Sequence, residues 1–150
     1  MFGKKEDIEI LKSNIFVNLA TTTKEEAIRF CGNKLVEAGY VDEEYIESML
    51  NRERMLNTYI DYGIAIPHGD RESQELILKS GLIVAQYKNG INFGDDKTAE
   101  VLIATAGKGN NHLRILSGIA TISKDPSLID KLITTNDPQD ILNVLDEFIK

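Results

Sequence analysis

Two histidines next to loop-forming residues are the most chemically distinctive side chains in this sequence of 150 residues. His68 lies in the run Gly63-Ile64-Ala65-Ile66-Pro67-His68-Gly69, where a proline stiffens the approach and a glycine leaves the imidazole uncrowded. An imidazole with a pKa of ~6.5 is largely neutral at neutral pH and keeps the lone pair that attack on phosphorus requires. We therefore interpret His68 as a candidate nucleophile, against the alternative that it only ends a turn.

His112 and Arg52 are the two further candidates for binding an anion. His112 begins a predicted helix, where free backbone amides and the helix dipole favour negative charge. The alternative is a polar residue at a helix end that Asn110 and Asn111 already cap. Arg52 ends another predicted helix, where it offers either a fork of donors for phosphoryl oxygens or a surface charge matched to the dipole. From the residues alone, the surface interpretation of Arg52 is favoured.

Other chemistries have little support in the sequence. Two histidines without a nearby cysteine do not make a structural zinc site, and His68 with Asp70 is a weak candidate for a metal site. There is no Gly-x-Ser-x-Gly elbow and no Gly-x-x-x-x-Gly-Lys-Ser/Thr loop, and Gly107-Lys108-Gly109 lacks the third glycine of a dinucleotide fingerprint. Hydrolase, nucleotidase and dehydrogenase functions are therefore not indicated.

The composition limits the partners. A net charge of −7, from 17 basic and 24 acidic residues, argues against nucleic acid and against direct membrane contact, whereas it would attract a protein with a basic face. Acidity that only aids solubility is the alternative. The start of the chain is too charged for a signal peptide, no apolar run approaches the ~18 residues that span a bilayer, and Cys31 has no disulfide partner. We expect a cytoplasmic protein.

Two helices are predicted in the first part of the chain, before the segment that contains His68. Thr23-Lys24-Glu25-Glu26 is a capping box that starts the first helix, and Gly39 can end it in a left-handed conformation. Its apolar stripe has helical spacing and comprises Ala27, Cys31, Leu35 and Ala38. Cys31 is thus interpreted as a core residue.

The second helix begins near Asp42 and ends in the very polar segment Asn51–Arg54. Its inward residues are Ile46, Met49 and Leu50.

Short apolar segments predict the strands. Residues 64–66 form a strand that leads into the turn at His68. Residues 81–87 and 100–105 are partly β-branched and fit adjacent strands buried on both faces, joined through Asn89-Gly90 and a loop over residues 93–97.

Three helices complete the pattern. Residues 112–123 form the first, and its apolar side comprises Leu116, Ile119, Ala120 and Ile122. Asp125-Pro126 and Asp137-Pro138 each pair a capping acid with a proline suited to the first turn of a helix. Helices before, between and after a few buried strands predict an α/β (α+β) sandwich, as one domain over residues 1–150.

The histidine run resembles the phosphorylation-site signature of the mannitol/fructose class of enzyme IIA in the bacterial sugar phosphotransferase system. The resemblance covers nearly the whole chain and looks closest to the mannitol branch. Further segments that carry it are Thr23-Lys24-Glu25-Glu26-Ala27-Ile28, Gly39-Tyr40-Val41, Met49-Leu50-Asn51-Arg52-Glu53 and Asn110-Asn111-His112-Leu113. It implies a mixed sheet of about five strands flanked by helices, in agreement with the order of elements above.

The resemblance also implies a function. His68 would accept a phosphoryl group from the phosphocarrier protein HPr and give it to a cysteine of enzyme IIB, on a separate chain, during uptake of mannitol or a related polyol. His112 and Arg52 would stabilise the phosphoryl group. Such a phosphotransferase component needs no cofactor, metal or nucleotide.

One position departs from mannitol members, and other functions stay open. Asn111 stands where those members often carry an acid, which leaves the protonation of His112 undecided. A regulatory module of the nitrogen-related type, signalling through phosphorylated His68, is the main alternative. The third possible function is that of a structural or interaction protein, in which neither histidine has a chemical role.

Overall fold

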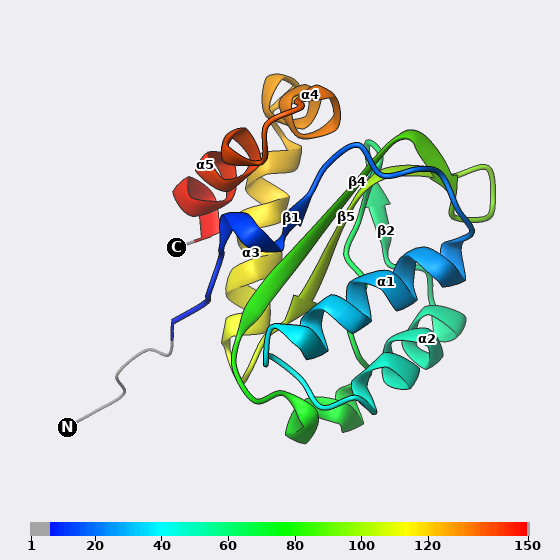
Figure 1. The fold of residues 1–150 in the computed structure, drawn as a ribbon, viewed down its shortest axis with the longest axis vertical. Coiled ribbons are helices and arrows are strands. Elements are labelled where there is room, and N and C mark those ends of the chain that lie inside the picture. The colour runs from blue at the N-terminus through cyan, green and yellow to red at the C-terminus, as the bar shows by residue number, and fades with distance from the viewer. Residues whose placement is uncertain (1–6, 150) are drawn as a thin grey trace.

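The computed structural model describes residues 7–149, in which a central sheet is covered by helices on both faces (Figure 1). The strands are β1 (Ile15–Phe16), β2 (Tyr59–Asp61), β3 (Ile64–Ala65), β4 (Gly81–Asn92) and β5 (Thr98–Ala106). The helices are α1 (Lys24–Glu37), α2 (Tyr45–Met55), α3 (Asn111–Ser123), α4 (Pro126–Thr134) and α5 (Pro138–Ile149), with the 3-10 helices η1 (Lys12–Asn14) and η2 (Arg71–Leu76).

The sheet is mixed and has the strand order β1-β4-β5-β3-β2. The long strands β4 and β5 are antiparallel neighbours, while β3 runs parallel to β5 and pairs Ile64 with Val101. The predicted α/β sandwich with about five mixed strands is therefore confirmed, as is the adjacency of the two long strands. The short edge strands β1 and β2 were not predicted. Asn89 and Gly90 lie within β4, which runs on through a register shift to Asn92.

The two faces of the sheet form two cores. Successive residues of β4 point to opposite faces, so that Ile83 packs with α1 and α2 while Val84 packs with the C-terminal helices. In Figure 1, α1 and α2 lie on one side of β4 and β5, and α3, α4 and α5 lie on the other. The ends of the central strands are thus held between two helical layers.

Helix α1 follows its prediction. The Oγ1 of Thr23 accepts a hydrogen bond from the Glu26 amide at 3.1 Å, and Gly39 has a φ of +81°. Three residues of the predicted stripe are fully buried, namely Ala27, Cys31 and Leu35. Ala38 is half-buried. The core interpretation of Cys31 is confirmed.

Helix α2 begins at Tyr45, so the predicted start near Asp42 is wrong. The carbonyl of Asp42 accepts from the Tyr45 amide at 2.9 Å in a turn that precedes the helix. The inward residues are buried as predicted: Ile46, Met49 and Leu50. At the polar end of this helix, however, Glu53 is also buried, at 8% exposure.

Helix α3 differs from its prediction in two details. Ala120 is exposed and Ile115 is fully buried. The face of the helix that packs into the core therefore includes Ile115 in place of Ala120. Asn110 has helical backbone angles, and its side chain makes no capping bond. The acids at the two later helix starts do cap, since Asp125 accepts from the Ser127 amide and Asp137 from the Gln139 amide, both at 2.9 Å.

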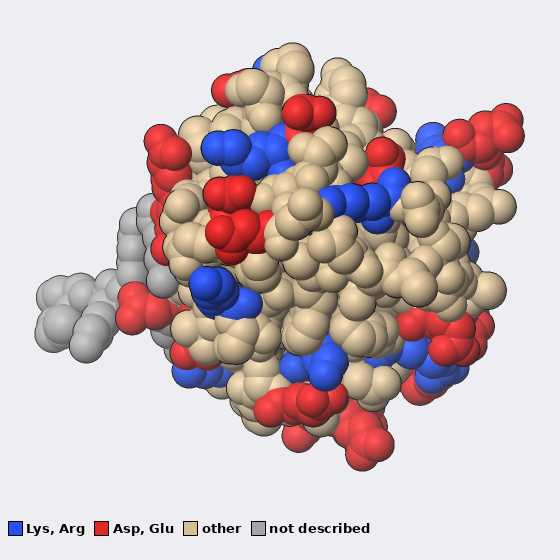
Figure 2. Space-filling model, turned by 45° about the horizontal axis from the view of Figure 1, so that its top comes forward, with Lys and Arg blue, Asp and Glu red and all other residues tan. Residues whose placement is uncertain are grey.

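The surface carries charges of both signs. On the face shown in Figure 2, lysine and arginine side chains are interspersed with aspartate and glutamate rather than gathered by sign. Within residues 7–149, every helix is too short or too polar to cross a bilayer.

Candidate functional site

One pocket, of about 290 Å³, brings the three candidate residues together. Its lining residues are Tyr45, Arg52, His68, Gly69, Asp70, Arg71, Gln74, Gly107 and His112. They come from α2, from the segment after β3, from the turn after β5 and from the first turn of α3. The sequence prediction that His68, His112 and Arg52 share a site therefore has a geometric basis, while their roles stay a prediction.

A backbone carbonyl fixes the orientation of the His68 ring. The Nδ1 of His68 lies 2.7 Å from the carbonyl oxygen of Ile66, and because that oxygen only accepts, Nδ1 carries the proton. The next residue is also held, since the Pro67 carbonyl accepts from the Thr105 amide of β5 at 2.9 Å. In the neutral ring the lone pair is therefore on Nε2, which is the nitrogen available for reaction.

The surroundings of His68 favour its neutral form. Burial lowers the pKa of the ring, the bond to Ile66 opposes this shift, and the positive charge of Arg52 lowers the pKa further. Glu53 opposes the effect of Arg52. A pKa below ~6.5 keeps the imidazole unprotonated at neutral pH, as a nucleophile requires.

His112 occupies the first turn of α3 and lies beside His68. The two ring centroids are 4.8 Å apart and the rings are inclined by 55°. Burial, His68 and Arg52 together lower the pKa of His112 to about 4. Asn111, the departure from the mannitol pattern, turns its amide to Ser80 at 2.9 Å. His112 is thus neutral at neutral pH, with one N–H to donate.

The turn before His112 has room only for glycine. A Cβ on Gly107 would lie 2.5 Å from the Cα of His112, so that the two backbones are in direct contact. The loop is also held by Gln74, whose amide donates to the Gly107 carbonyl at 3.2 Å. This close approach brings the start of α3 against the strand end that precedes it.

Arg52 reaches the pocket from the last turn of α2. Its Nη1 donates to the carbonyl of Leu56, the residue that ends the helix. Arg71 and Asp70 also line the pocket, and the sequence interpretation did not include Arg71. Two guanidinium groups and one carboxylate make this pocket locally basic in an acidic chain, as suits a phosphoryl group.

Two hydroxyl groups of α2 hold the chain after His68. The hydroxyl of Tyr45 accepts from the Gly69 amide at 2.8 Å, and the hydroxyl of Ser48 accepts from the Asp70 amide at 2.9 Å. The sequence interpretation missed both residues. A signal was present, because Tyr45, Ser48 and Arg52 are spaced three and four apart and so share one face of the helix.

The arrangement suits transfer of an anionic group to an imidazole. A neutral, oriented imidazole lies beside a guanidinium and a second imidazole N–H, which are donors suited to the oxygens of a phosphoryl group. Within residues 7–149, no group of three or more His, Cys, Asp or Glu side chains is placed to hold a metal ion.

Comparison with known proteins agrees with this chemistry. Residues 9–148 match the family described as "Phosphoenolpyruvate-dependent sugar phosphotransferase system, EIIA 2". The mannitol-specific phosphotransferase enzyme IIA component of Bacillus subtilis is 39% identical over 138 residues, which are 92% of this chain and 96% of that protein.

A longer relative and a solved complex show the same similarity. The mannitol-specific EIICBA component of Vibrio cholerae is 40% identical over 139 residues, which are 91% of this chain but only 21% of that relative. The complex of enzyme IIAMtl with phosphorylated enzyme IIBMtl from Escherichia coli matches with a TM-score of 0.88 and 36% identity, covering 93% of this chain and 99% of the matched one.

Proposed function

The chain belongs to the EIIA 2 family of the phosphoenolpyruvate-dependent sugar phosphotransferase system, and on that basis we propose that it is a phosphocarrier. It accepts a phosphoryl group from phosphorylated HPr on His68 and passes the group to a cysteine of an enzyme IIB. Mannitol, or a related polyol, is the sugar served, and the cytoplasm is the place of transfer. The mannitol-specific relatives at 39% and 40% identity support this substrate and disfavour the regulatory alternative.

The observation that carries the proposal is the orientation of one ring. With Nδ1 bound to the Ile66 carbonyl, His68 keeps its lone pair on Nε2 and lines a pocket that Arg52 and His112 also line. A histidine that only ended a turn would need neither the contact with the Ile66 carbonyl nor Arg52 and His112 as neighbours. The same geometry supports phosphoryl transfer as the reaction.

The transfer balances without any further reactant. Nε2 of His68 attacks the phosphorus of phosphorylated HPr in line, and the N–P bond of HPr breaks as its imidazole leaves with the electron pair. Nδ1 keeps its proton, so the phosphorylated ring becomes positively charged, and the Ile66 carbonyl at 2.7 Å stabilises that charge. A cysteine thiolate of enzyme IIB then attacks the same phosphorus and releases His68 in its neutral form.

Arg52 and His112 stabilise the phosphoryl group during both transfers. The guanidinium of Arg52 has donors in a planar fork that fits two phosphoryl oxygens. His112, whose pKa is about 4, stays neutral and donates one N–H. These donors neutralise charge that spreads over the equatorial oxygens in the transition state.

Exposed apolar side chains beside the pocket support proteins as the partners. Leu56, whose carbonyl binds Arg52, is 68% exposed, and Leu113, which follows His112, is 66% exposed. Apolar side chains at the rim of a polar pocket are typical of a surface that another protein covers. We propose that HPr and enzyme IIB dock over this rim in turn.

Incubation with phosphorylated HPr tests the proposal. The expected result is an acid-labile phosphate on the wild-type protein and none on His68→Ala. Subsequent transfer of the label to the cysteine of a mannitol enzyme IIB would distinguish the carrier from a regulator. A His68→Ala variant that took up label would refute the role of His68, and a labelled protein that no enzyme IIB could discharge would refute the carrier function.

A further inference from the structure

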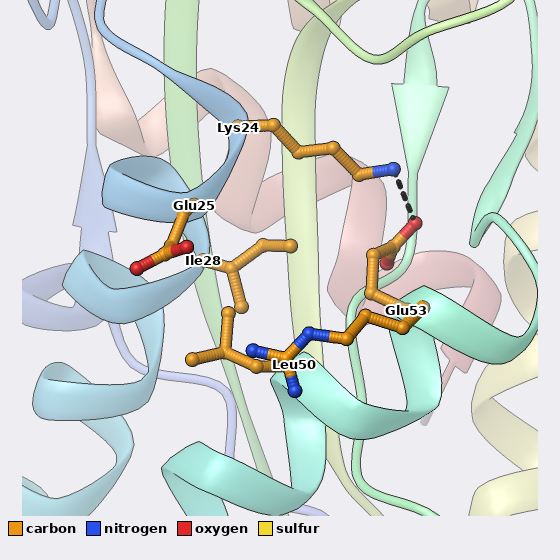
Figure 3. Close-up of a pocket in the computed structure, with 6 residues that line it drawn as sticks. Lys24, Glu25, Ile28, Leu50 and Glu53 are labelled. Atoms are coloured by element: carbon orange, nitrogen blue, oxygen red, sulfur yellow. Dashed lines mark ion pairs between the residues drawn. The ribbon is translucent and has the colours of Figure 1, made fainter.

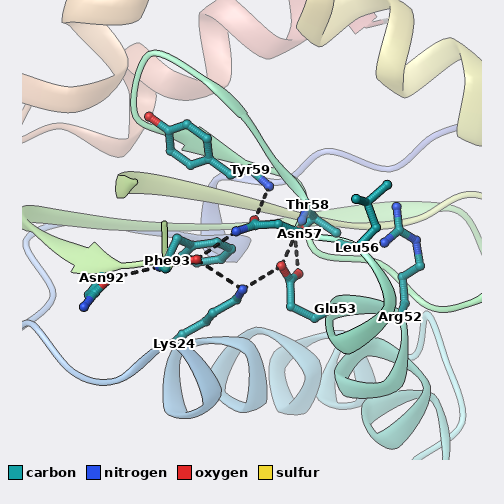
Figure 4. A network of polar contacts seen from close by, with 10 residues as sticks. Lys24, Arg52, Glu53, Leu56, Asn57, Thr58, Tyr59, Asn92 and Phe93 are labelled. Atoms are coloured by element: carbon teal, nitrogen blue, oxygen red, sulfur yellow. Dashed lines mark hydrogen bonds and ion pairs between the residues drawn. The ribbon is translucent and has the colours of Figure 1, made fainter. Parts of the chain in front are cut away.

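Glu53 is a buried carboxylate that follows Arg52 in α2 but does not line the pocket. Figure 4 shows its contacts. Its Oε2 accepts from the backbone amide of Thr58 at 2.8 Å, and its Oε1 accepts from the hydroxyl of Thr58 at 2.5 Å. Both oxygens therefore bind one residue, which is itself buried. This double contact fixes the chain between the end of α2 and the start of β2.

The fixed segment leads directly to His68. The carbonyl of Thr58 accepts from the Ile66 amide at 3.0 Å. The carbonyl on the other side of the same residue, Ile66, accepts from Nδ1 of His68 at 2.7 Å. Glu53 is thus connected to the His68 ring by a chain of hydrogen bonds that runs through Thr58 and Ile66.

The same segment also leads to Arg52. The carbonyl that Nη1 of Arg52 binds belongs to Leu56, two residues before Thr58. Leu56 ends the helix with extended backbone angles, so its carbonyl direction depends on where the following residues are held. Figure 4 shows Arg52 and Glu53 leaving the end of α2 toward this one stretch of chain.

Lys24 of α1 completes the arrangement. Its Nζ lies 3.0 Å from Oε2 of Glu53 and donates to the Phe93 carbonyl at 3.3 Å. Figure 3 shows this ion pair at the edge of a pocket between α1 and α2, whose volume is about 260 Å³. A buried carboxylate needs such a partner, because burying it alone is costly. Lys24 therefore compensates the charge of Glu53 from the neighbouring helix α1.

We propose that Glu53 is a positioning residue for phosphoryl transfer, which sets both the His68 ring and the Arg52 guanidinium through the segment from Leu56 to Thr58. The inference rests on the proposed phosphocarrier function. Loss of the carboxylate would let this segment move, and a displacement of about 1 Å at reacting groups is enough to slow a reaction by ~10²-fold. Glu53 touches neither the phosphoryl group nor a partner in this scheme.

Two matched substitutions test the proposal at either end of the contact. Glu53→Gln keeps the volume but replaces one acceptor oxygen by an amide that cannot accept from Thr58. Thr58→Val removes the hydroxyl, and Thr58→Ser is its control because it keeps that hydroxyl. Gln86→Met is a control for lost stability, since Gln86 is fully buried on β4 and accepts from the Asn18 amide at 2.9 Å.

The readouts are the kinetics of phosphate uptake from phosphorylated HPr and the ¹⁵N shifts of the His68 ring, which report its tautomer. We expect Glu53→Gln to lower kcat by ~10-fold or more with KM changed by less than about 2-fold. The Nδ1–H tautomer should give way to a mixture. Thr58→Val should show a smaller loss of the same kind, and Thr58→Ser and Gln86→Met should keep the wild-type kcat and tautomer.

A purely structural role would give a different result. Glu53→Gln would then lower the denaturation midpoint, as Gln86→Met does, while kcat and the tautomer stayed as in the wild type, and this outcome would overturn the proposal. If Glu53→Gln does not fold, the comparison of Thr58→Val with Thr58→Ser decides in the same way. If the wild type itself takes up no phosphate, the carrier function fails, and the tautomer measurement still decides the role of Glu53.

Discussion

The imidazole rings of His68 and His112 lie with their centroids 4.8 Å apart, and the positive charge of Arg52 lowers the pKa of both. Two neutral rings beside a permanent cation form a site that prefers an incoming anion to an incoming proton. This relationship would let the pocket keep the proposed nucleophile, His68, unprotonated and still offer donors to phosphoryl oxygens.

Removal of either donor should slow transfer without preventing docking. We expect His112→Ala and Arg52→Ala each to lower the rate of phosphate uptake from phosphorylated HPr by ~10²-fold, because each removes a donor for the equatorial oxygens. Single-turnover kinetics with labelled HPr would measure the effect. Arg54→Ala is the matched control, since Arg54 lies on the same helix, is exposed and donates to Asn51 at 2.7 Å. Equal rates for all three variants would contradict the assigned roles.

The phosphate should be attached to Nε2 of His68. Nδ1 keeps its proton in the bond to the Ile66 carbonyl at 2.7 Å, so that only Nε2 has a lone pair for phosphorus. The two phosphohistidine isomers have different ³¹P chemical shifts, and a spectrum of the labelled protein in denaturant would identify the isomer. A signal from the Nδ1 isomer would show that the ring turns over before it reacts.

Stability should fall as the pH is lowered through the range of histidine titration. The pKa of His112 is lowered to about 4 in the folded protein, whereas an exposed histidine has a pKa of ~6.5. Between these values the unfolded chain binds more protons, so the free energy of unfolding decreases as the pH falls. His68, whose pKa is lowered too, adds to the effect.

Urea denaturation at several pH values would measure this dependence. We expect His112→Gln to reduce the slope of the free energy of unfolding between about pH 4 and ~6.5. Well above pH ~6.5, the free energies of unfolding of the wild type and His112→Gln should differ by a constant amount, since the histidines are then neutral in the folded and the unfolded state. A wild-type slope in His112→Gln would mean that other groups cause the acid sensitivity.

Tyr45 should stabilise the loop after His68 through its hydroxyl group. That hydroxyl accepts from the Gly69 amide at 2.8 Å and donates to the Thr105 carbonyl at 3.1 Å. Tyr45→Phe would leave both groups without this partner, at a cost of about 1–3 kcal/mol in the free energy of unfolding. Tyr62→Phe is the control, because Tyr62 is 62% exposed and should change stability by less than about 0.5 kcal/mol.

The outcome for Tyr45→Phe separates two possibilities. A variant that matched Tyr62→Phe in chemical denaturation would show that water replaces the hydroxyl at no cost. A variant that lost stability should also accept phosphate more slowly, because the loop carrying His68 is then less well held.

The main elements could be predicted from the sequence because their patterns are long and local. The apolar strands around Ile83 and Ile103 and the cap at Thr23 depend on neighbouring residues only. Strand β1 consists of two residues, Ile15 and Phe16, and is too short for any periodicity to appear. It forms because β4 offers a partner from a distant part of the chain.

The site could be predicted in part, for a similar reason. The run that contains His68 is contiguous, so its turn and its candidate nucleophile could be proposed from the sequence. From the sequence, Glu53 is interpreted only as part of a very polar helix end, since nothing nearby in the sequence reveals that Lys24 and Thr58 contact it. Its burial comes from contacts with α1 and with the chain before β2, which arise only after the helices pack.

The bond between Nδ1 of His68 and the Ile66 carbonyl leaves a single nitrogen for both phosphoryl transfers. In the proposed carrier, donor and acceptor proteins must therefore use the same atom at different times, and neither can react while the other is bound. The kinetics should be ping-pong, and a large excess of unphosphorylated HPr should slow delivery to enzyme IIB by competition. The rate of sugar uptake would then depend on the fractions of the carrier that are bound to HPr and to enzyme IIB.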